Sequence, residues 1–349
     1  MRVLHVASGR EWRGGQRQVL LLARGLAESP SVDSAVMTGR GTLLARRLLD
    51  AGVQVHEVSW GPGLDPRVVA RLVGEVSATT IVHAHDSHAH ALADVAARWR
   101  RAPLVVTRRD MPRIKNGRRY RRAAAVIAIS SAVRQTLLDA DVAAGRIHVV
   151  PDGVDLDAHA RRDRTMFAAS PTIVCIAALR TVKGIDILLD AAALLRPQCP
   201  DARWLVLGEG PERPHLEAQR SRLGLTEVVQ LPGFVTAPED QLARATIAVQ
   251  PSRVEALSSS VLDALALGVP VVASNVDGLP EALAQGGGVL VPPASPLELA
   301  AAVRRLLEDG AERARLGAEG RVAAQQFGIA RLVERTLDVY RSVAQTQGS

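Results

Sequence analysis

The sequence predicts two doubly wound α/β domains joined by a short linker. Its 349 residues exceed the roughly 250–300 residues that usually share one hydrophobic core. Apolar residues make up 47% of the chain, and no low-complexity tract interrupts it. Short apolar runs alternate with amphipathic stretches from end to end, a pattern typical of parallel sheets covered by helices.

The first half contains one series of apolar runs. Between them lie helical patterns such as 16–27, which places Val19, Leu20, Leu22, Ala23 and Leu26 on one face. Pro151-Asp152-Gly153 ends the series. We expect strands at 2–7, 34–37, 54–58, 80–83, 104–107, 126–129 and 148–150.

A second series follows a stretch, 154–170, that has no clear periodicity and reads as a linker. We expect its strands at 172–179, 202–207, 228–231, 247–250, 269–273 and 288–291. The predicted boundaries are an N-terminal domain at 1–150, a linker at 151–170, a C-terminal domain at 171–328, and a helix at 329–349 that packs back towards the N-terminal domain. In such sheets ligands bind beyond the carboxyl ends of the strands, and two facing domains make a cleft.

Cysteine content and hydropathy favour a cytoplasmic protein. The two isolated cysteines, Cys175 and Cys199, suit a reducing compartment and suggest neither a disulfide nor a zinc framework. The apolar run at 1–8 is too short for a signal-peptide core. No apolar stretch approaches the roughly 18–20 residues that span a bilayer.

The net charge is +7, and basic residues are concentrated between positions 98 and 122, where eleven of them accompany a single acid, Asp110. Such a segment attracts phosphate-rich lipid or an anionic substrate, and the alternative is a solvated face in an arginine-rich chain. We do not expect a nucleic-acid partner, because aromatic residues make up only 3% of the chain and stacking platforms are missing.

Lys183 follows the first strand of the second domain, in Arg180-Thr-Val-Lys183-Gly184. The chain has only two lysines, Lys115 and Lys183, among 43 basic residues. A compact ammonium approaches a phosphate where a guanidinium is too large. We therefore favour a diphosphate-binding loop over an ordinary surface lysine.

The segment from Gln250 to Asp263 predicts a strand, a loop with Glu255, and a helix that begins near Ser259 or Ser260. Serines there cap the helix and leave backbone N–H groups available to an anion. Asp263, about one turn into the helix, is placed to reach sugar or ribose hydroxyls. The alternative is a capping cluster with two solvated acids.

Two further features carry weaker signals. Gly14 and Gly15, between the first strand and the first helix, let the backbone pass close to a ligand, and Gly208-Glu209-Gly210 makes a similar turn. His83, His85, His88 and His90 gather at one strand end, but a metal site would need further ligands from later strand ends. We favour His85 as a side chain that hydrogen-bonds substrate hydroxyls, and His83 as buried structure.

Read together, these segments resemble the retaining GT-B glycosyltransferases of family 4, also called glycosyl transferases group 1. The resemblance runs nearly end to end and implies two Rossmann-like domains facing a central cleft. It rests on the order and spacing of modest matches, which are Gly14-Gly15, His83-Ala-His85, the 150–155 segment, Leu179 to Gly184, the 208–211 turn, Leu231-Pro-Gly-Phe234-Val235, the Glu255/Asp263 segment, 268–272 and 277–281.

The resemblance assigns roles to these residues. It implies that Lys183 neutralises the departing diphosphate, that backbone groups from Leu257 and Ser258 to Ser260 bind its oxygens, and that Glu255 faces the donor sugar. Asp263 would hold the ribose, and the loops with Gly208, Glu209 and Phe234 would border the base. It also implies a metal-independent reaction without a cofactor, in which the leaving phosphate helps to deprotonate the acceptor and developing charge on the diphosphate is stabilised.

The sequence departs from the family pattern in four respects, at five positions. Ala178 replaces an arginine, for which Arg180 is the candidate substitute; Asp263 replaces a glutamate; Ala256 and Ser258 replace glycines; and Arg109 replaces a first-domain histidine. The family's first domain binds the acceptor, so the basic segment 98–122 suggests an anionic, lipid-linked or envelope-glycan acceptor. The rivals are a GT-B sugar-nucleotide epimerase and a non-catalytic sugar-nucleotide-binding homologue.

Overall fold

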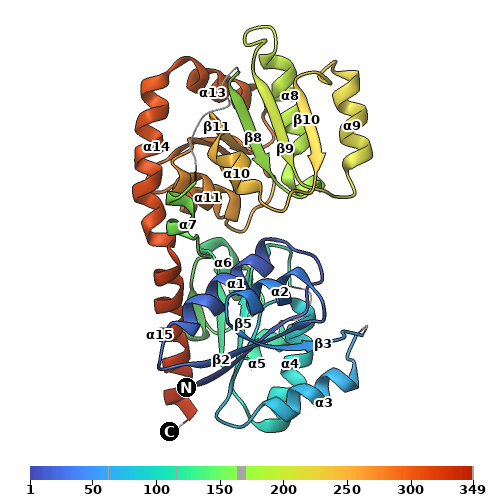
Figure 1. Ribbon diagram of the computed structural model, residues 1–349, viewed down its shortest axis with the longest axis vertical. Helices are drawn as coiled ribbons and strands as arrows, with labels where there is room; N and C mark the ends of the chain where they lie inside the picture. Colours follow the sequence, from blue (N-terminus) through green and yellow to red (C-terminus); the bar gives the residue numbers. More distant parts are fainter. Residues whose placement is uncertain (62, 115–116, 163–169, 348–349) are drawn as a thin grey trace. The chain divides into compact units, whose positions relative to one another are not determined.

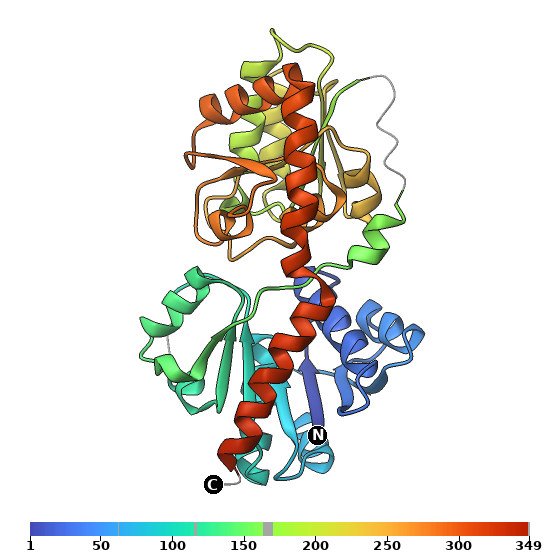
Figure 2. The same cartoon turned by 90° about the vertical axis from the view of Figure 1, so that its left-hand side faces the viewer.

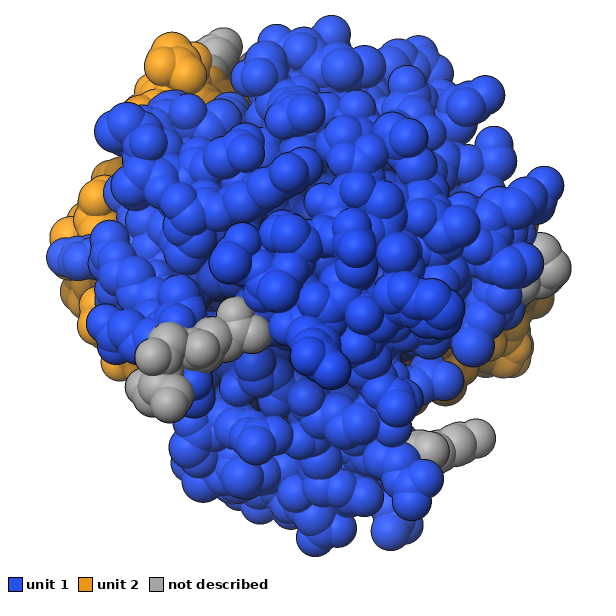
Figure 3. Space-filling model, turned by 90° about the horizontal axis from the view of Figure 1, so that it is seen from below, with its two compact units in different colours: residues 1–153, 328–349 blue, residues 154–327 orange. Residues whose placement is uncertain are grey.

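The computed structural model describes residues 1–61, 63–114, 117–162 and 170–347. The chain divides into two compact units, which Figure 3 colours separately: unit 1 comprises residues 1–153 and 328–349, and unit 2 comprises residues 154–327. Each unit is built around its own parallel sheet.

Unit 1 contains a seven-stranded sheet in the order β3-β2-β1-β4-β5-β6-β7. Its neighbouring strands all pair in parallel, and His5 of β1 lies opposite His83 of β4. All seven predicted strands are confirmed, with small shifts of their ends. They are β1 (Arg2–Ala7), β2 (Asp33–Gly39), β3 (Gln54–Val58), β4 (Ile81–Ala84), β5 (Leu104–Arg108), β6 (Ala125–Ala128) and β7 (Ile147–Val149).

Several helices of unit 1 begin at a capping side chain. Thr42, Asp86 and Ser130 each accept a backbone N–H from the first turn of the helix that follows. The helices are α1 (Gly14–Ala27), α2 (Leu43–Asp50), α3 (Pro66–Glu75), α4 (Ser87–Arg100), α5 (Arg118–Arg122), α6 (Ser131–Leu138) and, from the end of the chain, α15 (Ile329–Gln347).

The C-terminal helix α15 is part of the core of unit 1. Its apolar residues join Val3, Leu22 and Val105 in one buried cluster, and Tyr340 is fully buried there. Figure 2 shows this helix in red, crossing the face of the unit 1 sheet. Burial of one apolar face explains why so distant a segment is held against the first strands.

Unit 2 contains a six-stranded parallel sheet in the order β10-β9-β8-β11-β12-β13, most of which can be followed in Figure 1. All six predicted strands are confirmed, although β8 ends at Ile176 rather than at position 179. The strands are β8 (Thr172–Ile176), β9 (Arg203–Leu207), β10 (Val229–Gly233), β11 (Ile247–Gln250), β12 (Val271–Ser274) and β13 (Gly288–Val291).

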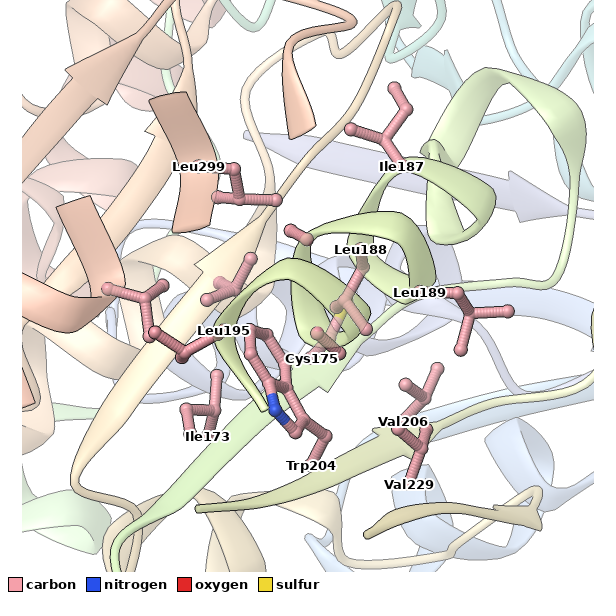
Figure 4. Close-up of a cluster of buried hydrophobic side chains, with 14 of the residues drawn as sticks. Ile173, Cys175, Ile187, Leu188, Leu189, Leu195, Trp204, Val206, Val229 and Leu299 are labelled. Carbon is pink, nitrogen blue, oxygen red and sulfur yellow. The ribbon is translucent and has the colours of Figure 1, made fainter. Parts of the chain in front are cut away.

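Helices cover both faces of the unit 2 sheet because alternate strand residues point to opposite sides. On one side Cys175 and Trp204 pack against Leu188 and Leu195 of α8, as Figure 4 shows. The helices are α7 (Leu156–Ala160), α8 (Ile185–Leu195), α9 (Arg213–Arg222), α10 (Pro238–Ala243), α11 (Ser259–Leu267), α12 (Leu279–Ala282), α13 (Pro296–Glu308) and α14 (Gly310–Ala324).

The segment predicted as a linker is more ordered than its composition suggests. Asp155 accepts the backbone N–H of Ala158 and so caps the short helix α7. The chain enters unit 2 at Val154, whose N–H bonds to the carbonyl of Phe327 at 2.8 Å. The prediction of an irregular stretch at 154–170 is therefore wrong for α7, while residues 163–169 lie outside the described part of the chain.

Within the described residues, no helix is both long enough and apolar enough to cross a membrane. Cys175 is buried and Cys199 is half-buried, and neither forms a disulfide. Burial raises the pKa of the Cys175 thiol to about 12, so this cysteine behaves as a core residue.

Candidate functional site

Each sheet has one point where the order of its strands reverses direction. These points lie between β1 and β4 in unit 1 and between β8 and β11 in unit 2. Loops that leave neighbouring strands there diverge to opposite faces, which opens a crevice at the carboxyl edge where ligands bind. The loop with Lys183 follows β8 and the loop with Glu255 follows β11, so both predicted residues lie at the reversal point of unit 2.

Lys183 and Glu255 form an ion pair in the structure. The Lys183 ammonium donates to both carboxylate oxygens of Glu255, at 2.8 and 2.7 Å. The Glu255 side chain is 8% exposed and the Lys183 side chain 24%. The buried Glu255 carboxylate is therefore bonded to the ammonium group that the sequence assigns to a diphosphate. A bound diphosphate would compete with Glu255 for Lys183.

Other side chains, which the sequence reasoning missed, hold the carboxylate of Glu255 in place. Gln250 and Ser252 both donate to its Oε2, at 3.0 and 3.1 Å. The backbone N–H of Glu255 itself donates to the Asp277 carboxylate at 2.9 Å. The signal for Gln250 was a polar residue ending an otherwise apolar strand, directly before the loop.

The loop with Lys183 packs tightly against the loop with Glu255. Gly184 has φ +65°, and a Cβ at that position would lie 2.1 Å from the carbonyl oxygen of Pro251. Only glycine tolerates both the left-handed backbone and this close approach. Gly184 therefore fixes the distance across which Lys183 reaches Glu255.

The predicted helix start is confirmed, since α11 begins at Ser259. The predicted serine cap is wrong: Ser258 makes no capping hydrogen bond, and instead its hydroxyl lies 3.0 Å from that of Ser260, which donates to Gln250. Among the described residues we find no acceptor for the backbone N–H groups of Ser259 and Ser260. These donors and the helix dipole leave the start of α11 suited to an anion.

Ser258 adopts φ +76°, a backbone conformation that residues other than glycine rarely adopt. This is one of the positions where the family pattern has glycine. Strain of this kind persists where the surrounding structure holds it, and it clusters at functional sites. The preceding residue, Leu257, has a buried side chain, so only its backbone is placed to contact a ligand.

Asp263 differs from the expectation of an open carboxylate. It is 3% exposed, and its Oδ1 lies 2.7 Å from Nε2 of His159, which comes from α7. His159 is buried as well and was not predicted to take part. Since one carboxylate oxygen is already engaged, Asp263 joins α7 to α11, and its role towards a ribose stays a prediction.

The glycines at 208 and 210 pack against the strand-end loop of β8. Cβ atoms at Gly208 and Gly210 would lie 2.0 Å from the carbonyl oxygen of Ala177 and 2.3 Å from that of Leu179. Glu209 accepts from Arg213 at 2.7 Å, and Arg213 lowers the pKa of this carboxyl. These contacts fix the loop that is predicted to border the base.

Phe234, predicted on the base side, and Arg180, predicted in the diphosphate loop, are both exposed. Phe234 is 53% exposed, directly after β10. Arg180 lines a groove of about 70 Å³ together with Asp186, Glu212 and His215. An exposed aromatic ring and a cation suit a nucleotide. Arg180 also contacts Lys183 through the backbone, since the N–H of Lys183 donates to the carbonyl of Arg180 at 2.8 Å.

In unit 1, Arg109 is held by two neighbours. Its Nε donates to Asp152 at 2.9 Å, and its Nη1 lies 3.4 Å from Nδ1 of His85. Burial raises the pKa of Asp152, although the guanidinium of Arg109 opposes this shift. The structure thus brings Arg109 and His85, two predicted catalytic residues, into contact.

His85 is not the open hydroxyl-binding side chain that we expected. It is 6% exposed, and its other ring nitrogen lies 2.9 Å from Nδ1 of His5. Burial holds the pKa of His85 well below its usual value, with further lowering from His83, His5 and Arg109. His85 is therefore a neutral, buried group that supports Arg109.

His5, His83 and His85 together form a buried cluster whose ligand nitrogens lie within 4.8 Å of one another. His83 is bonded to Tyr340 and to Thr107, both at 2.6 Å. A metal ion would have to displace these bonds and lie beside the positive charge of Arg109, with no carboxylate among the cluster's three members. The arrangement fits a structural network better than a metal centre.

Gly14 and Gly15 are the first two residues of α1, so the helix begins two residues earlier than predicted and the glycines lie within it, not in a turn before it. A Cβ at Gly15 would meet no atom within 4 Å, so the space above this helix start is open. At the adjacent reversal point, Ser8 donates from both its N–H and its hydroxyl to the Asp86 carboxylate, at 2.7 and 2.5 Å. These two bonds join the residue after β1 to the residue that caps α4.

The basic segment 98–122 does not form one uniform surface. Arg108 is buried against Tyr120, and Arg122 pairs with the buried Asp94 at 2.5 Å. By topology, Arg109 lies beyond the carboxyl end of β5, whereas the residues before β5 lie at the opposite edge of the sheet. The exposed members are Arg98, Arg100, Arg101, Arg113, Arg118, Arg119, Arg121 and Arg122, and Lys115 lies outside the described residues.

Comparison with known proteins agrees with this arrangement. Residues 12–158 match the family model described as Glycosyltransferase Family 4, and residues 159–323 match Glycosyl transferases group 1. A D-inositol 3-phosphate glycosyltransferase of Catenulispora acidiphila is 31% identical over 83% of this chain and 81% of its own length. The chain belongs to the family 4, group 1 glycosyltransferases.

One further relative and one solved structure are similar to this glycosyltransferase. The MMP alpha-(1->4)-mannosyltransferase of Mycolicibacterium hassiacum is 34% identical over 70% of the chain and 60% of its own length. The structure of Anabaena HepE in complex with UDP and glucose superimposes with a TM-score of 0.85 over 98% of this chain and all of that one, at 21% identity. That structural likeness establishes the fold, which is GT-B with two Rossmann-like α/β units.

Proposed function

We propose that this glycosyltransferase moves a sugar from a nucleotide diphosphate donor to a hydroxyl of an anionic acceptor, with retention of anomeric configuration and without a metal. Cell-envelope glycan or glycolipid synthesis is the proposed setting. The observation that carries the proposal is the meeting of Lys183, Glu255 and the open start of α11 at the reversal point of unit 2.

The donor half of the reaction is assigned to unit 2. Lys183 and the N–H groups of Ser259 and Ser260 supply positive charge where a diphosphate gains negative charge as it departs. The Glu255 carboxylate, which Gln250 and Ser252 hold in place, would accept hydrogen bonds from hydroxyl groups of the donor sugar. HepE, which shares the fold, has been solved with UDP and with UDP-glucose, so a uridine nucleotide is the first donor to test.

The acceptor half is assigned to unit 1, where the chain is richest in arginine. Several relatives are D-inositol 3-phosphate glycosyltransferases by name, which suggests a phosphate-bearing acceptor for this chain too. Arg109, fixed by Asp152 and His85, is the candidate sugar-binding residue of this unit. The exposed Arg118 and Arg119 are proposed to contact anionic membrane lipid.

The donor assignment is tested by a thermal-shift panel of UDP, GDP and ADP and their sugars, followed by donor hydrolysis assays. A ligand that binds only the folded protein raises the midpoint of thermal unfolding by mass action, so the nucleotide with the correct base should give the largest rise. Lys183→Ala should abolish this shift and reduce hydrolysis at least 100-fold. Binding without turnover would instead support a non-catalytic homologue, and release of a rearranged sugar without acceptor would support an epimerase.

The membrane contact is tested separately. The variant Arg118→Glu/Arg119→Glu should bind anionic vesicles more weakly than the parent at low salt, because each basic residue near such a surface contributes about 1 kcal/mol. Donor hydrolysis should be unchanged in this variant. Equal vesicle binding by the two proteins would remove the membrane from the proposal and leave the sugar-transfer reaction untouched.

A further inference from the structure

Arg253 joins the two loops that carry Lys183 and Glu255. Its Nη1 and Nη2 donate to Oδ1 and Oδ2 of Asp186, at 2.7 and 2.6 Å. The same Nη1 donates to the carbonyl of Thr181 at 3.0 Å. The backbone adds two more bonds, since the N–H groups of Arg253 and Val254 both donate to the carbonyl of Val182, at 2.9 and 3.2 Å.

The ion pair between Arg253 and Asp186 is of a strong type. A guanidinium that bonds a carboxylate with two parallel N–H groups fixes orientation as well as distance. The side chains are 34% and 31% exposed, so water screens the pair only in part. The hydrogen bond from Arg253 lowers the pKa of the Asp186 carboxyl, and Asp186 lies in the first turn of α8, where a negative charge is favourable.

These contacts bracket the candidate donor site along the chain. Asp186 lies three residues after Lys183, and Arg253 lies two residues before Glu255. When a diphosphate draws Lys183 away, the ion pair between Lys183 and Glu255 no longer ties the loops together. The bonds of Arg253 do not involve Lys183 or Glu255, so they persist in that state.

We propose that the Arg253–Asp186 pair is a positioning device that holds the Lys183 loop against the Glu255 loop while the donor is bound. The inference rests on the proposed function, because it assumes that these loops hold a nucleotide diphosphate donor. Neither Arg253 nor Asp186 needs to touch the donor. They act through the placement of Lys183 and Glu255, for which a misplacement of about 1 Å costs up to roughly 100-fold in rate.

The test compares Arg253→Gln, Asp186→Asn and the double variant in donor hydrolysis, with UDP binding measured by calorimetry. We expect each single variant to lower kcat/KM about tenfold or more, mostly through kcat, with no further loss in the double variant, because the two side chains act as one unit. Arg253→Lys should recover only part of the activity, since an ammonium lacks the two-pronged geometry. Arg315→Gln, which breaks an exposed pair with Glu319 on α14, is the matched control and should behave as the parent.

Two outcomes would overturn the proposal. If Arg253 bound phosphate directly, Asp186→Asn would free it and strengthen UDP binding, whereas Arg253→Gln would weaken it. If the pair were only structural, the variants would melt at lower temperature but keep the kcat and KM of the parent well below their midpoints. Failure of the proposed function looks different, because the parent itself would then neither bind UDP, GDP or ADP nor hydrolyse their sugars.

Discussion

Replacing Glu255 by Gln should strengthen the binding of the nucleotide diphosphate while it slows sugar transfer. In the structure the Glu255 carboxylate accepts two hydrogen bonds from the Lys183 ammonium, of 2.8 and 2.7 Å. An incoming diphosphate meets this negative charge and competes for the same ammonium. Glutamine keeps the size and one acceptor oxygen but removes the charge, so Lys183 becomes available to phosphate.

The size of the effect follows from the geometry. Two unit charges about 4 Å apart interact by about 4 kcal/mol at an effective dielectric constant near 20. The Lys183 side chain is 24% exposed, so solvent reduces this value. We expect about one-third to two-thirds of it to appear in binding, which is a roughly 10-fold to 100-fold lower Kd. Loss of the charged hydrogen bonds should lower the free energy of unfolding by about 2 kcal/mol.

Isothermal titration calorimetry with UDP, or with whichever nucleotide the thermal-shift panel selects, measures the effect at low and high salt. The tightening should shrink as salt screens the freed ammonium. Glu298→Gln makes the same charge change on the exposed first turn of α13 and should leave Kd unchanged. An unchanged or higher Kd for Glu255→Gln would refute the competition between Glu255 and the diphosphate.

Three further predictions concern stability. Burial lowers the pKa of His5 to about 3 and that of His90 to about 4, against 6.5 when unfolded, so below pH 6.5 the unfolded chain binds more protons. The free energy of unfolding should then fall as pH drops towards these values, by up to about 1.4 kcal/mol per pH unit for each histidine. A free energy of unfolding that stays constant in urea titrations between pH 7 and 5 would contradict this. Gly184→Ala should lower the midpoint of thermal unfolding by several degrees and weaken UDP binding, because the added Cβ would lie 2.1 Å from the carbonyl oxygen of Pro251. UDP binding equal to that of the parent would show that the two loops do not depend on this contact. His159→Ala should lower the free energy of unfolding by about 3 kcal/mol, since it removes the buried imidazole that lies 2.7 Å from the Asp263 carboxylate. A denaturant midpoint equal to that of the parent would mean that this contact does not stabilise the fold.

The fold was predictable because parallel strands that are buried on both faces appear in the sequence as short, nearly continuous apolar runs. Runs such as 104–107 and 247–250 are apolar except for their last residue, and each is a strand within a residue or two of its predicted ends. The helix α7 was missed because five residues with a single cap, Asp155, carry too little periodicity to be recognised. Its stability comes from α11, through the bond between His159 and Asp263.

The candidate site was predictable only in part, for a similar reason. Lys183 stood out by its rarity, and Glu255 by its place after a strand. Their mutual ion pair was not predictable, because the two residues lie 72 positions apart. Arg253 looked like one more arginine in a chain that has many, and nothing local marks its bond to Asp186.

By itself, the sequence determined two parallel sheets, the loops that leave their strands, and the residue types available at the reversal point. Those properties depend on hydrophobic periodicity and on neighbours along the chain, which any single sequence displays. Only the tertiary structure decided which polar and charged side chains meet: Lys183 with Glu255, Asp263 with His159, and Arg109 with Asp152. A buried charge requires a partner, and the partner is chosen by the packing of distant strands and helices, not by its distance along the chain.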